Sequence, residues 1–221
     1  MFDRWETDGT NHWKVCTRTG CGAAVNKTAH TSAAAWSSDA TNHWKDCTVC
    51  GYDTAFAAHT YDAENTCVCG DYKDKGVQFT LSSGTYTVTD YTGTATEVVI
   101  PATYKGVAVT GIGLWALEDC SNLTTVTLPD SVTSIGEGAF SDCTGLTSVT
   151  IPASVTSIGK YAFEYCFKLT SVTFANPNGW WRATSDTATS GTAIPAADLS
   201  DASTAAAYLE STYCNYCWKR T

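Results

Sequence analysis

Hydrophobic positions in the second half of the chain recur at a fixed interval, with polar residues between them. The motif L-x-x-V-x-[LIF] begins at Leu123, Leu146 and Leu169, which are 23 positions apart. Within each copy, V-T-L, V-T-I and V-T-F alternate apolar and polar residues with the period of two that a β-strand imposes. A fixed period of this length predicts a solenoid, in which each coil contributes one short strand and one compact return segment.

The segments between these strands repeat S-V-T-S-I-G-x-x-A-F-x-x-C and predict the other side of the same core. One coil cannot cover its own inner face, so neighbouring coils must bury it. We expect Gly136 and Gly159 to adopt turn conformations that other residues resist. The apolar residues expected in the core on this return side are Val132, Ile135, Val155, Ile158, Ala139, Phe140, Ala162 and Phe163.

Both ends of the solenoid depart from the period, as terminal coils usually do. Val77–Leu81 and Tyr86–Thr89 predict an entry hairpin around Ser83-Gly84. The segment from Glu97 to Pro101 is the first strand in the repeat register. The next coil carries an insertion of about five residues around Tyr104, as expected of an atypical terminal repeat.

After Phe174 the period stops, and a helix is predicted from Ala202 to Glu210. Ser200 or Asp201 can cap its first amides. The aromatic tail beyond this helix is expected to lie against the last coil, whose open edge must be covered. The residues that fall on one face of the helix are Ala202, Ala205, Ala206 and Leu209.

Composition excludes two classes of partner. The 221 residues carry a net charge of −9, which would repel a phosphate backbone, so we expect no nucleic-acid binding. The longest apolar runs fall short of the roughly 18 residues that a membrane helix needs, so we expect no membrane insertion.

A second, unrelated repeat occupies the first 70 residues. W-E-T-D-G-T-N-H-W-K-V-C, which begins at Trp5, matches W-S-S-D-A-T-N-H-W-K-D-C, which begins at Trp36. Each copy continues to a second cysteine followed by glycine and then to a histidine. The repeated cysteines and histidines are His12, Cys16, Cys21 and His30 in the first copy, and His43, Cys47, Cys50 and His59 in the second.

These residues predict one structural zinc ion in each copy. Two thiolates and two imidazoles form a closed tetrahedral site with no open position for a substrate. Two alternatives stay open at this point. Cys67 and Cys69 can join Cys47 and Cys50 in a zinc ribbon, or the six N-terminal cysteines can pair as disulfides. Disulfides alone leave the register of the histidines unexplained.

The two repeats predict two domains. Residues 1–75 hold the tandem Cys/His-rich modules, and residues 76–221 hold the solenoid, with regular coils over about 97–174 and a cap over 175–221. Met1 leads almost directly into the first module, without the basic head and apolar segment of a signal peptide. We therefore expect the sequence to be a fragment of a longer exported protein.

The coils I-P-x-S-V-T-S-I-G-x-x-A-F-x-x-C-x-x-L-T-S-V-T resemble the BspA-like leucine-rich-repeat family of bacterial surface proteins, over roughly Glu97 to Phe174. The resemblance implies an α/β-type repeat solenoid with short parallel strands and a helical C-terminal cap. It also implies a cell-surface or secreted location and a role in adhesion or protein binding, and it supplies no catalytic residues.

Two groups of residues are candidates for contact with a partner. The outward strand positions form a polar face that suits a protein or glycan on a host or neighbouring cell, although solubility and β-propensity also explain them. Trp180, Trp181 and Arg182 lie at the solenoid edge and are the residue types that anchor interfaces, although packing of at least one Trp in the core is the simpler interpretation. The outward strand positions are Thr125, Thr127, Ser148, Thr150, Ser171 and Thr173.

The remaining cysteines favour structural roles. Cys120, Cys143 and Cys166 form a ladder with the period of 23, at the place where such repeats carry a small buried side chain. Cys214 and Cys217 lack the helix N-terminus and βαβ context that activate a redox motif. Packing in the cap, or one local disulfide, is expected for this pair.

Together these features predict a non-enzymatic interaction or adhesion module. The main alternative is a structural spacer or assembly segment of a larger exported protein. A zinc-dependent hydrolase is the least favoured hypothesis, because both predicted ligand sets are complete without water.

Overall fold

The computed structural model describes the backbone of six N-terminal strands and, from Gly76 onward, the whole chain to Thr221. Two compact units are present, one made of Met1–Thr60 with Cys67–Asp71 and the other of Tyr61–Thr66 with Tyr72–Thr221. The predicted domain boundary near residue 75 stays a prediction.

The N-terminal strands form two three-stranded antiparallel sheets, ordered β1-β2-β3 and β4-β5-β6. Strands β2 and β5 carry the repeated N-H-W-K and start 31 residues apart, whereas β3 and β6 start only 29 apart, because C-x4-C in the first copy is shortened to C-x2-C in the second. The strands are β1 (Phe2–Thr7), β2 (Asn11–Cys16), β3 (Ala24–Ala29), β4 (Ser37–Ser38), β5 (Asn42–Asp46) and β6 (Asp53–Ala58).

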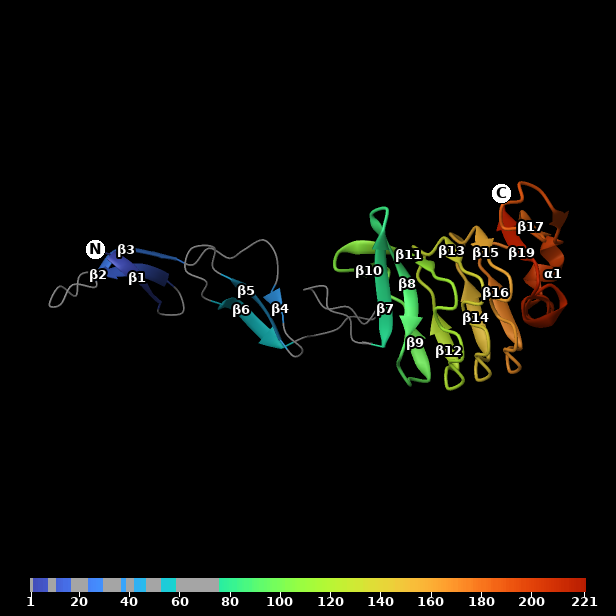
Figure 1. Cartoon of the computed structure of the whole chain (residues 1–221), viewed down its shortest axis with the longest axis horizontal. Coiled ribbons are helices and arrows are strands. Elements are labelled where there is room, and N and C mark those ends of the chain that lie inside the picture. Colours follow the sequence, from blue (N-terminus) through green and yellow to red (C-terminus); the bar gives the residue numbers. More distant parts are fainter. Residues whose placement is uncertain are drawn as a thin grey trace. The chain divides into compact units, whose positions relative to one another are not determined.

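The repeated V-T motifs form a four-stranded parallel sheet, ordered β16-β14-β12-β9 (Figure 1). Each strand is in register with the strand one coil away, so that Thr125 pairs with Ser148 and Ser148 pairs with Ser171. Its strands are β9 (Glu97–Val99), β12 (Thr125–Thr127), β14 (Ser148–Ile151) and β16 (Ser171–Phe174). The predicted solenoid with short parallel strands is confirmed.

A second sheet closes the other side of the coils and contains β11 (Val107–Ile112), β13 (Ser134–Ile135) and β15 (Ser157–Ile158), which are parallel to one another. The insertion in the first coil forms β10 (Thr103–Tyr104), which folds back antiparallel onto β11.

The predicted entry hairpin is confirmed as β7 (Val77–Ser82) and β8 (Thr85–Tyr91), and β8 continues the second sheet beside β11. Its two-residue turn has positive φ at Ser83 (51°) and Gly84 (83°). This is the conformation that a type I′ turn requires, and its twist matches that of the two strands.

The core lies between the two sheets, as the apolar positions predict. Val132 and Val155 are fully buried, and the rings of Phe140 and Phe163 stack with centroids 5.1 Å apart. Burying an aliphatic or aromatic side chain of this size contributes about 1.5–3 kcal/mol. Because equivalent residues stack along the solenoid axis, each coil completes the core of its neighbours.

The expected turn role of Gly136 and Gly159 is wrong. Neither has positive φ, and the recurring left-handed positions are instead Trp115, Gly138 and Tyr161. A Cβ on Gly136 would lie 2.6 Å from the Gly113 carbonyl carbon, and one on Gly159 would lie 2.3 Å from the Glu137 backbone nitrogen. These glycines are therefore required because the backbones of adjacent coils approach closely.

Hydroxyl ladders also join the coils. Ser131 donates to the Val109 carbonyl oxygen at 2.7 Å, and Ser154 donates to the Val132 carbonyl oxygen at 2.6 Å. Thr147 donates in the same way to the Thr124 carbonyl oxygen at 3.2 Å. The repeated Ser and Thr residues outside the strands thus bind the preceding coil.

The C-terminal segment forms a cap with helices and three further strands. The predicted helix is present as α2 (Ala202–Ala207) and continues as one π-helical turn, η1 (Tyr208–Thr212). Asp201 caps it by accepting a hydrogen bond from the Thr204 amide at 2.8 Å, and Ala205, Ala206 and Leu209 of the predicted face are buried. The pattern did not predict the short α1 (Ala196–Ser200).

The cap covers the last coil as expected. The strand β19 (Cys217–Arg220) pairs antiparallel with both β15 and β17 (Trp180–Ala183), and β18 (Thr192–Ala193) pairs with β17. Helix α2 packs against β16 (Figure 1). The open edge of the final coil is therefore occupied within this chain.

Candidate functional site

A groove runs across three coils of the parallel sheet and has a volume of about 450 Å³. It crosses β12, β14 and β16, so its width is set by the stacking of the coils. Six of the residues that line it are the outward hydroxyl positions predicted from the sequence, namely Thr125, Thr127, Ser148, Thr150, Ser171 and Thr173. The structure thus brings all six together on one surface, which we call the hydroxyl groove.

The six hydroxyls differ from the other repeated Ser and Thr side chains. None of them hydrogen bonds to another residue between Gly76 and Thr221, whereas Thr124 and Thr133 donate to carbonyl oxygens of the preceding coil at 2.9 and 3.1 Å. Thr127, Ser148, Thr150 and Thr173 are exposed. Their donors and acceptors are therefore available to a ligand.

No residue that lines the hydroxyl groove is ionisable. The apolar members Val126, Leu128 and Val149 are buried and form its floor. The groove is consequently a neutral surface with hydrogen-bonding walls, and it offers neither an acid–base pair nor a nucleophile beside a base.

The second predicted contact group separates into a core residue and two partly accessible ones. Trp180 is 2 % exposed, packs edge to face on Phe174 with centroids 5.3 Å apart, and donates through Nε1 to the Asn176 carbonyl oxygen. We therefore remove Trp180 from the candidate contact residues, since burial leaves its indole no surface for a partner.

Trp181 and Arg182 are half-buried on β17 and do not line the groove. The Arg182 guanidinium lies over the rings of Tyr213 and Tyr216, at 4.0 and 4.6 Å from their centroids. This cation–π arrangement fixes the side chain. Their role in partner binding stays a prediction.

The cysteine ladder is buried in its second and third members. The thiols of Cys143 and Cys166 each donate to a carbonyl oxygen of the preceding coil at 3.1 Å. Burial raises the pKa of Cys166 to about 12, so this thiol stays protonated near neutral pH. Cys120 is half-buried and differs from the other two.

Cys214 and Cys217 are free thiols in the structure. Burial raises the pKa of both, and Glu164 adds to the effect at Cys214. A raised pKa lowers the fraction of reactive thiolate, which agrees with the expected packing role and not with a redox motif.

The predicted zinc ligands fall outside the residues whose side chains the structure describes. On the backbone, β2 pairs His12 with Thr28, two residues before His30, and β5 pairs His43 with Ala57, two residues before His59. Between Gly76 and Thr221 no group of three or more His, Cys, Asp or Glu residues could hold a metal ion. Zinc stays a prediction for the N-terminal modules.

In the part of the chain that the structure describes, every helix is too short or too polar to cross a bilayer.

Solved structures with similar folds come from three bacteria. A leucine-rich cell surface protein of Faecalibacterium prausnitzii A2-165 is 39% identical, with 47% of this chain and 31% of that chain covered and a TM-score of 0.41. The leucine-rich-repeat protein of T. pallidum is 23% identical, covering 48% and 61%, with a TM-score of 0.39. A leucine-rich-repeat protein of Bacteroides capillosus is 25% identical, covering 45% and 94%, with a TM-score of 0.33.

This chain thus spans about a third of the Faecalibacterium protein. No curated protein matches the chain. The family model for the BspA-type leucine-rich-repeat region matches residues 86–184 in six copies. These residues include the coils, both sheets and the hydroxyl groove. The solenoid of this chain belongs to the BspA-type leucine-rich-repeat family.

Proposed function

We propose that this chain is a protein-interaction module and that the hydroxyl groove is the surface that binds the partner. Leucine-rich-repeat regions commonly bind other proteins, and their solenoids provide extended binding surfaces. The observation that carries the proposal is the contrast among the hydroxyls. Those between coils are hydrogen-bonded within the protein, and the six in the groove are not.

The groove indicates what kind of contact it makes. Its hydroxyls recur at the spacing of neighbouring strands, about 4.8 Å, and can both donate and accept hydrogen bonds. It lacks the Trp, Tyr and Arg residues that dominate tight interfaces, so a single chain binds with modest affinity. The net charge of −9 favours encounter with a neutral or basic protein surface over an acidic one.

The finer proposal is that the module acts outside the bacterial cell, in adhesion to a host or neighbouring cell. It rests on the resemblance of the coils to bacterial surface proteins. Cell-surface labelling of the producing bacterium with an impermeant biotin reagent tests the location. Labelling only after lysis would exclude it.

The test of the groove uses added charge. Thr127→Arg with Thr150→Arg puts two long cations into the neutral groove, and we expect cell binding to fall at least about tenfold, the equivalent of about 1.4 kcal/mol. Thr133→Arg with Thr156→Arg is the matched control, because these threonines are exposed and one coil apart but lie outside the groove.

Flow cytometry of the labelled chain on target cells measures the effect, with far-ultraviolet circular dichroism to verify folding. Equal binding by the groove variant and the control would refute the groove as the docking surface. Protease treatment of the cells abolishes binding to a protein partner. Loss of binding after periodate treatment alone would instead identify a glycan.

The absence of catalysis stays a prediction. A spacer role predicts no saturable binding in the same assay.

A further inference from the structure

The first cysteine of the ladder has no carbonyl of a preceding coil to bind. Cys143 and Cys166 donate to the carbonyl oxygens of Leu117 and Phe140, each 26 residues earlier. The same offset from Cys120 leads to Thr94, and no hydrogen bond joins the two within residues 76–221. Cys120 instead makes a long contact of 3.6 Å to the Glu118 carbonyl oxygen of its own coil.

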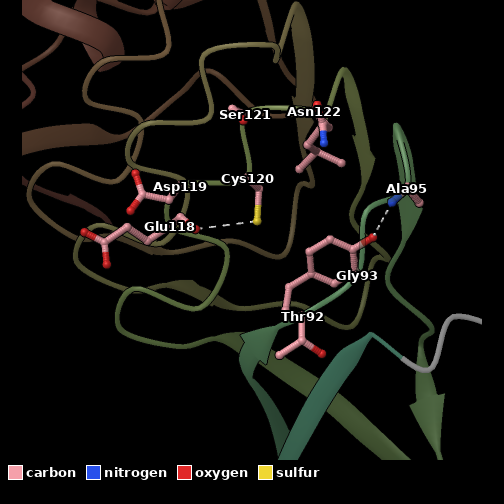
Figure 2. A pocket seen from close by; sticks show the side chains of 10 residues that line it. Thr92, Gly93, Ala95, Glu118, Asp119, Cys120, Ser121 and Asn122 are labelled. Atoms are coloured by element: carbon pink, nitrogen blue, oxygen red, sulfur yellow. Dashed lines mark hydrogen bonds between the residues drawn. The ribbon is translucent and has the colours of Figure 1, made fainter.

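A pocket of about 170 Å³ occupies the place of the missing contact. Its walls are the Tyr91–Ala95 segment on one side and the Glu118–Leu123 turn on the other. Figure 2 shows the Cys120 sulfur directed into this pocket, with the Tyr91 hydroxyl tied to the Ala95 amide at 3.1 Å across it. Cys120 is half-buried, whereas Cys143 and Cys166 have no exposed surface.

Cys143 lies directly behind Cys120 in the next coil. The two coils are hydrogen-bonded here, from the Leu117 amide to the Ala139 carbonyl oxygen at 2.8 Å and from the Asp119 amide to the Ser141 carbonyl oxygen at 3.0 Å. Layers joined in this way lie about 4.8 Å apart. A disulfide needs a Cα separation of about 4.4–6.8 Å, so adjacent members of the ladder lie within its range.

The electrostatics distinguish the two thiols. A hydrogen bond from Cys143 lowers the pKa of Cys120. The same hydrogen bond, followed by burial, raises the pKa of Cys143. Since the thiolate is the nucleophile, Cys120 is the thiol that reacts first.

We propose that Cys120 and Cys143 form a disulfide between adjacent coils when a small-molecule disulfide enters the pocket. The Cys120 thiolate attacks one sulfur of the small disulfide, forms a mixed disulfide and releases the first small thiolate, which takes up the Cys120 proton. The Cys143 sulfur then attacks the Cys120 sulfur, and its proton goes to the second departing thiolate. Two protein thiols are oxidised by two electrons, and one small disulfide is reduced to two thiols.

The experiment uses the full reduced chain and oxidised glutathione. After acid quenching, the remaining thiols are alkylated and the chain is cleaved on the carboxyl side of glutamate at low pH. Cleavage after Glu118, Glu137 and Glu164 places Cys120, Cys143 and Cys166 in three different peptides. We expect mass spectrometry to find the Cys120 peptide joined to the Cys143 peptide, and Cys120 to react at least about 100-fold faster than Cys166.

The wild-type protein alone decides the outcome. A mixed disulfide that persists on Cys120, or a Cys120 that stays reduced, would overturn the proposal. Cys143→Ser is expected to stop at the mixed disulfide, and Cys120→Ser to leave Cys143 reduced while the chain is folded. Cys166→Ser is the matched control and is expected to close the bridge as the wild type does.

Discussion

Single glycines carry requirements that are invisible in the repeat pattern. Gly136 follows the same apolar motif as Gly159, and both backbones lie against the preceding coil, with no room for a Cβ. Gly84, in contrast, has positive φ, and a Cβ added there would meet nothing within 4 Å. Two glycines of one chain are thus required for different reasons, contact in one case and conformation in the other.

The first prediction follows from this contrast. Gly136→Ala forces two coils apart and is expected to lower the free energy of unfolding by about 2–4 kcal/mol, within the range for overpacked or strained sites. Gly84→Asn is the control, because asparagine tolerates the left-handed conformation and meets no neighbour, and we expect a change below about 0.5 kcal/mol. Urea unfolding followed by circular dichroism measures both. An equal loss in the two variants would contradict the close-approach argument.

Asp201 gives a pH prediction at the same scale. Hydrogen bonds from the Ser203 hydroxyl and the Thr204 amide lower its pKa to about 2, below the value of about 4 for an unfolded chain. A carboxyl whose pKa is lowered by folding stabilises the protein above the unfolded pKa. Its contribution is therefore lost as pH falls from about 4 to about 2.

Asp201→Asn keeps a capping side chain without a titrating group, so its urea midpoint is expected to lose this part of the pH dependence. Asp201→Ala loses the cap at every pH. The difference between wild type and Asp201→Asn, measured from pH 5 to 2, isolates the effect. A difference that does not change over this range would contradict it.

The sequence predicts burial better than it predicts contact. The period of 23 correctly predicts the strands and the inward valines, because alternation reports which side chains leave water. It does not show that Ser131 binds the Val109 carbonyl oxygen or that Gly136 touches Gly113, because those partners lie one coil away. The groove hydroxyls could be placed on one face, but their lack of protein partners required the structure.

At the scale of elements, the C-terminal cap is the part that ends the solenoid. Trp218 of β19 is 1 % exposed and stacks parallel to Phe174 with centroids 6.1 Å apart. Trp218→Ala is expected to cost about 3–5 kcal/mol, since it leaves a large cavity over the last coil. Phe167→Ala is the control, because Phe167 is 70 % exposed, and its expected cost is below about 0.5 kcal/mol. Urea unfolding in which both variants match wild type would show that β19 does not hold the cap.

The N-terminal modules give a metal prediction. Protein purified anaerobically, without reductant or added zinc, is expected to contain two zinc ions per chain by elemental analysis. Unfolding with a chelator should then expose all eleven cysteines to a thiol reagent. Chelator without denaturant is expected to change the circular dichroism of the modules, because zinc contributes to their folding.

Three outcomes separate the hypotheses for these modules. Two zinc ions support a ligand set of two histidines and two cysteines in each copy. One zinc ion that survives substitution of both His43 and His59 favours the ribbon that uses Cys67 and Cys69. No metal, with only the five thiols that the structure shows as free, would establish disulfides in the first 70 residues.

At the scale of the whole molecule, the two ends of the solenoid are finished differently. Helix α2 and strand β19 complete the last coil, whereas the first coil carries the entry hairpin, the insertion at β10 and the pocket beside Cys120. The regular coils between them present the only groove that crosses three repeats among those described for residues 76–221. Docking is therefore expected on this groove and not at either end of the solenoid.

The most direct test of docking in the hydroxyl groove is site-specific photo-crosslinking. A benzoylphenylalanine at Thr150, in the groove, is compared with one at Thr156, an exposed threonine outside it, on the intact chain bound to target cells. The account predicts a discrete crosslinked protein at Thr150 that excess unlabelled chain competes away, and no such product at Thr156. Crosslinking that is equal at the two positions, or confined to Thr156, would contradict a docking role for the hydroxyl groove.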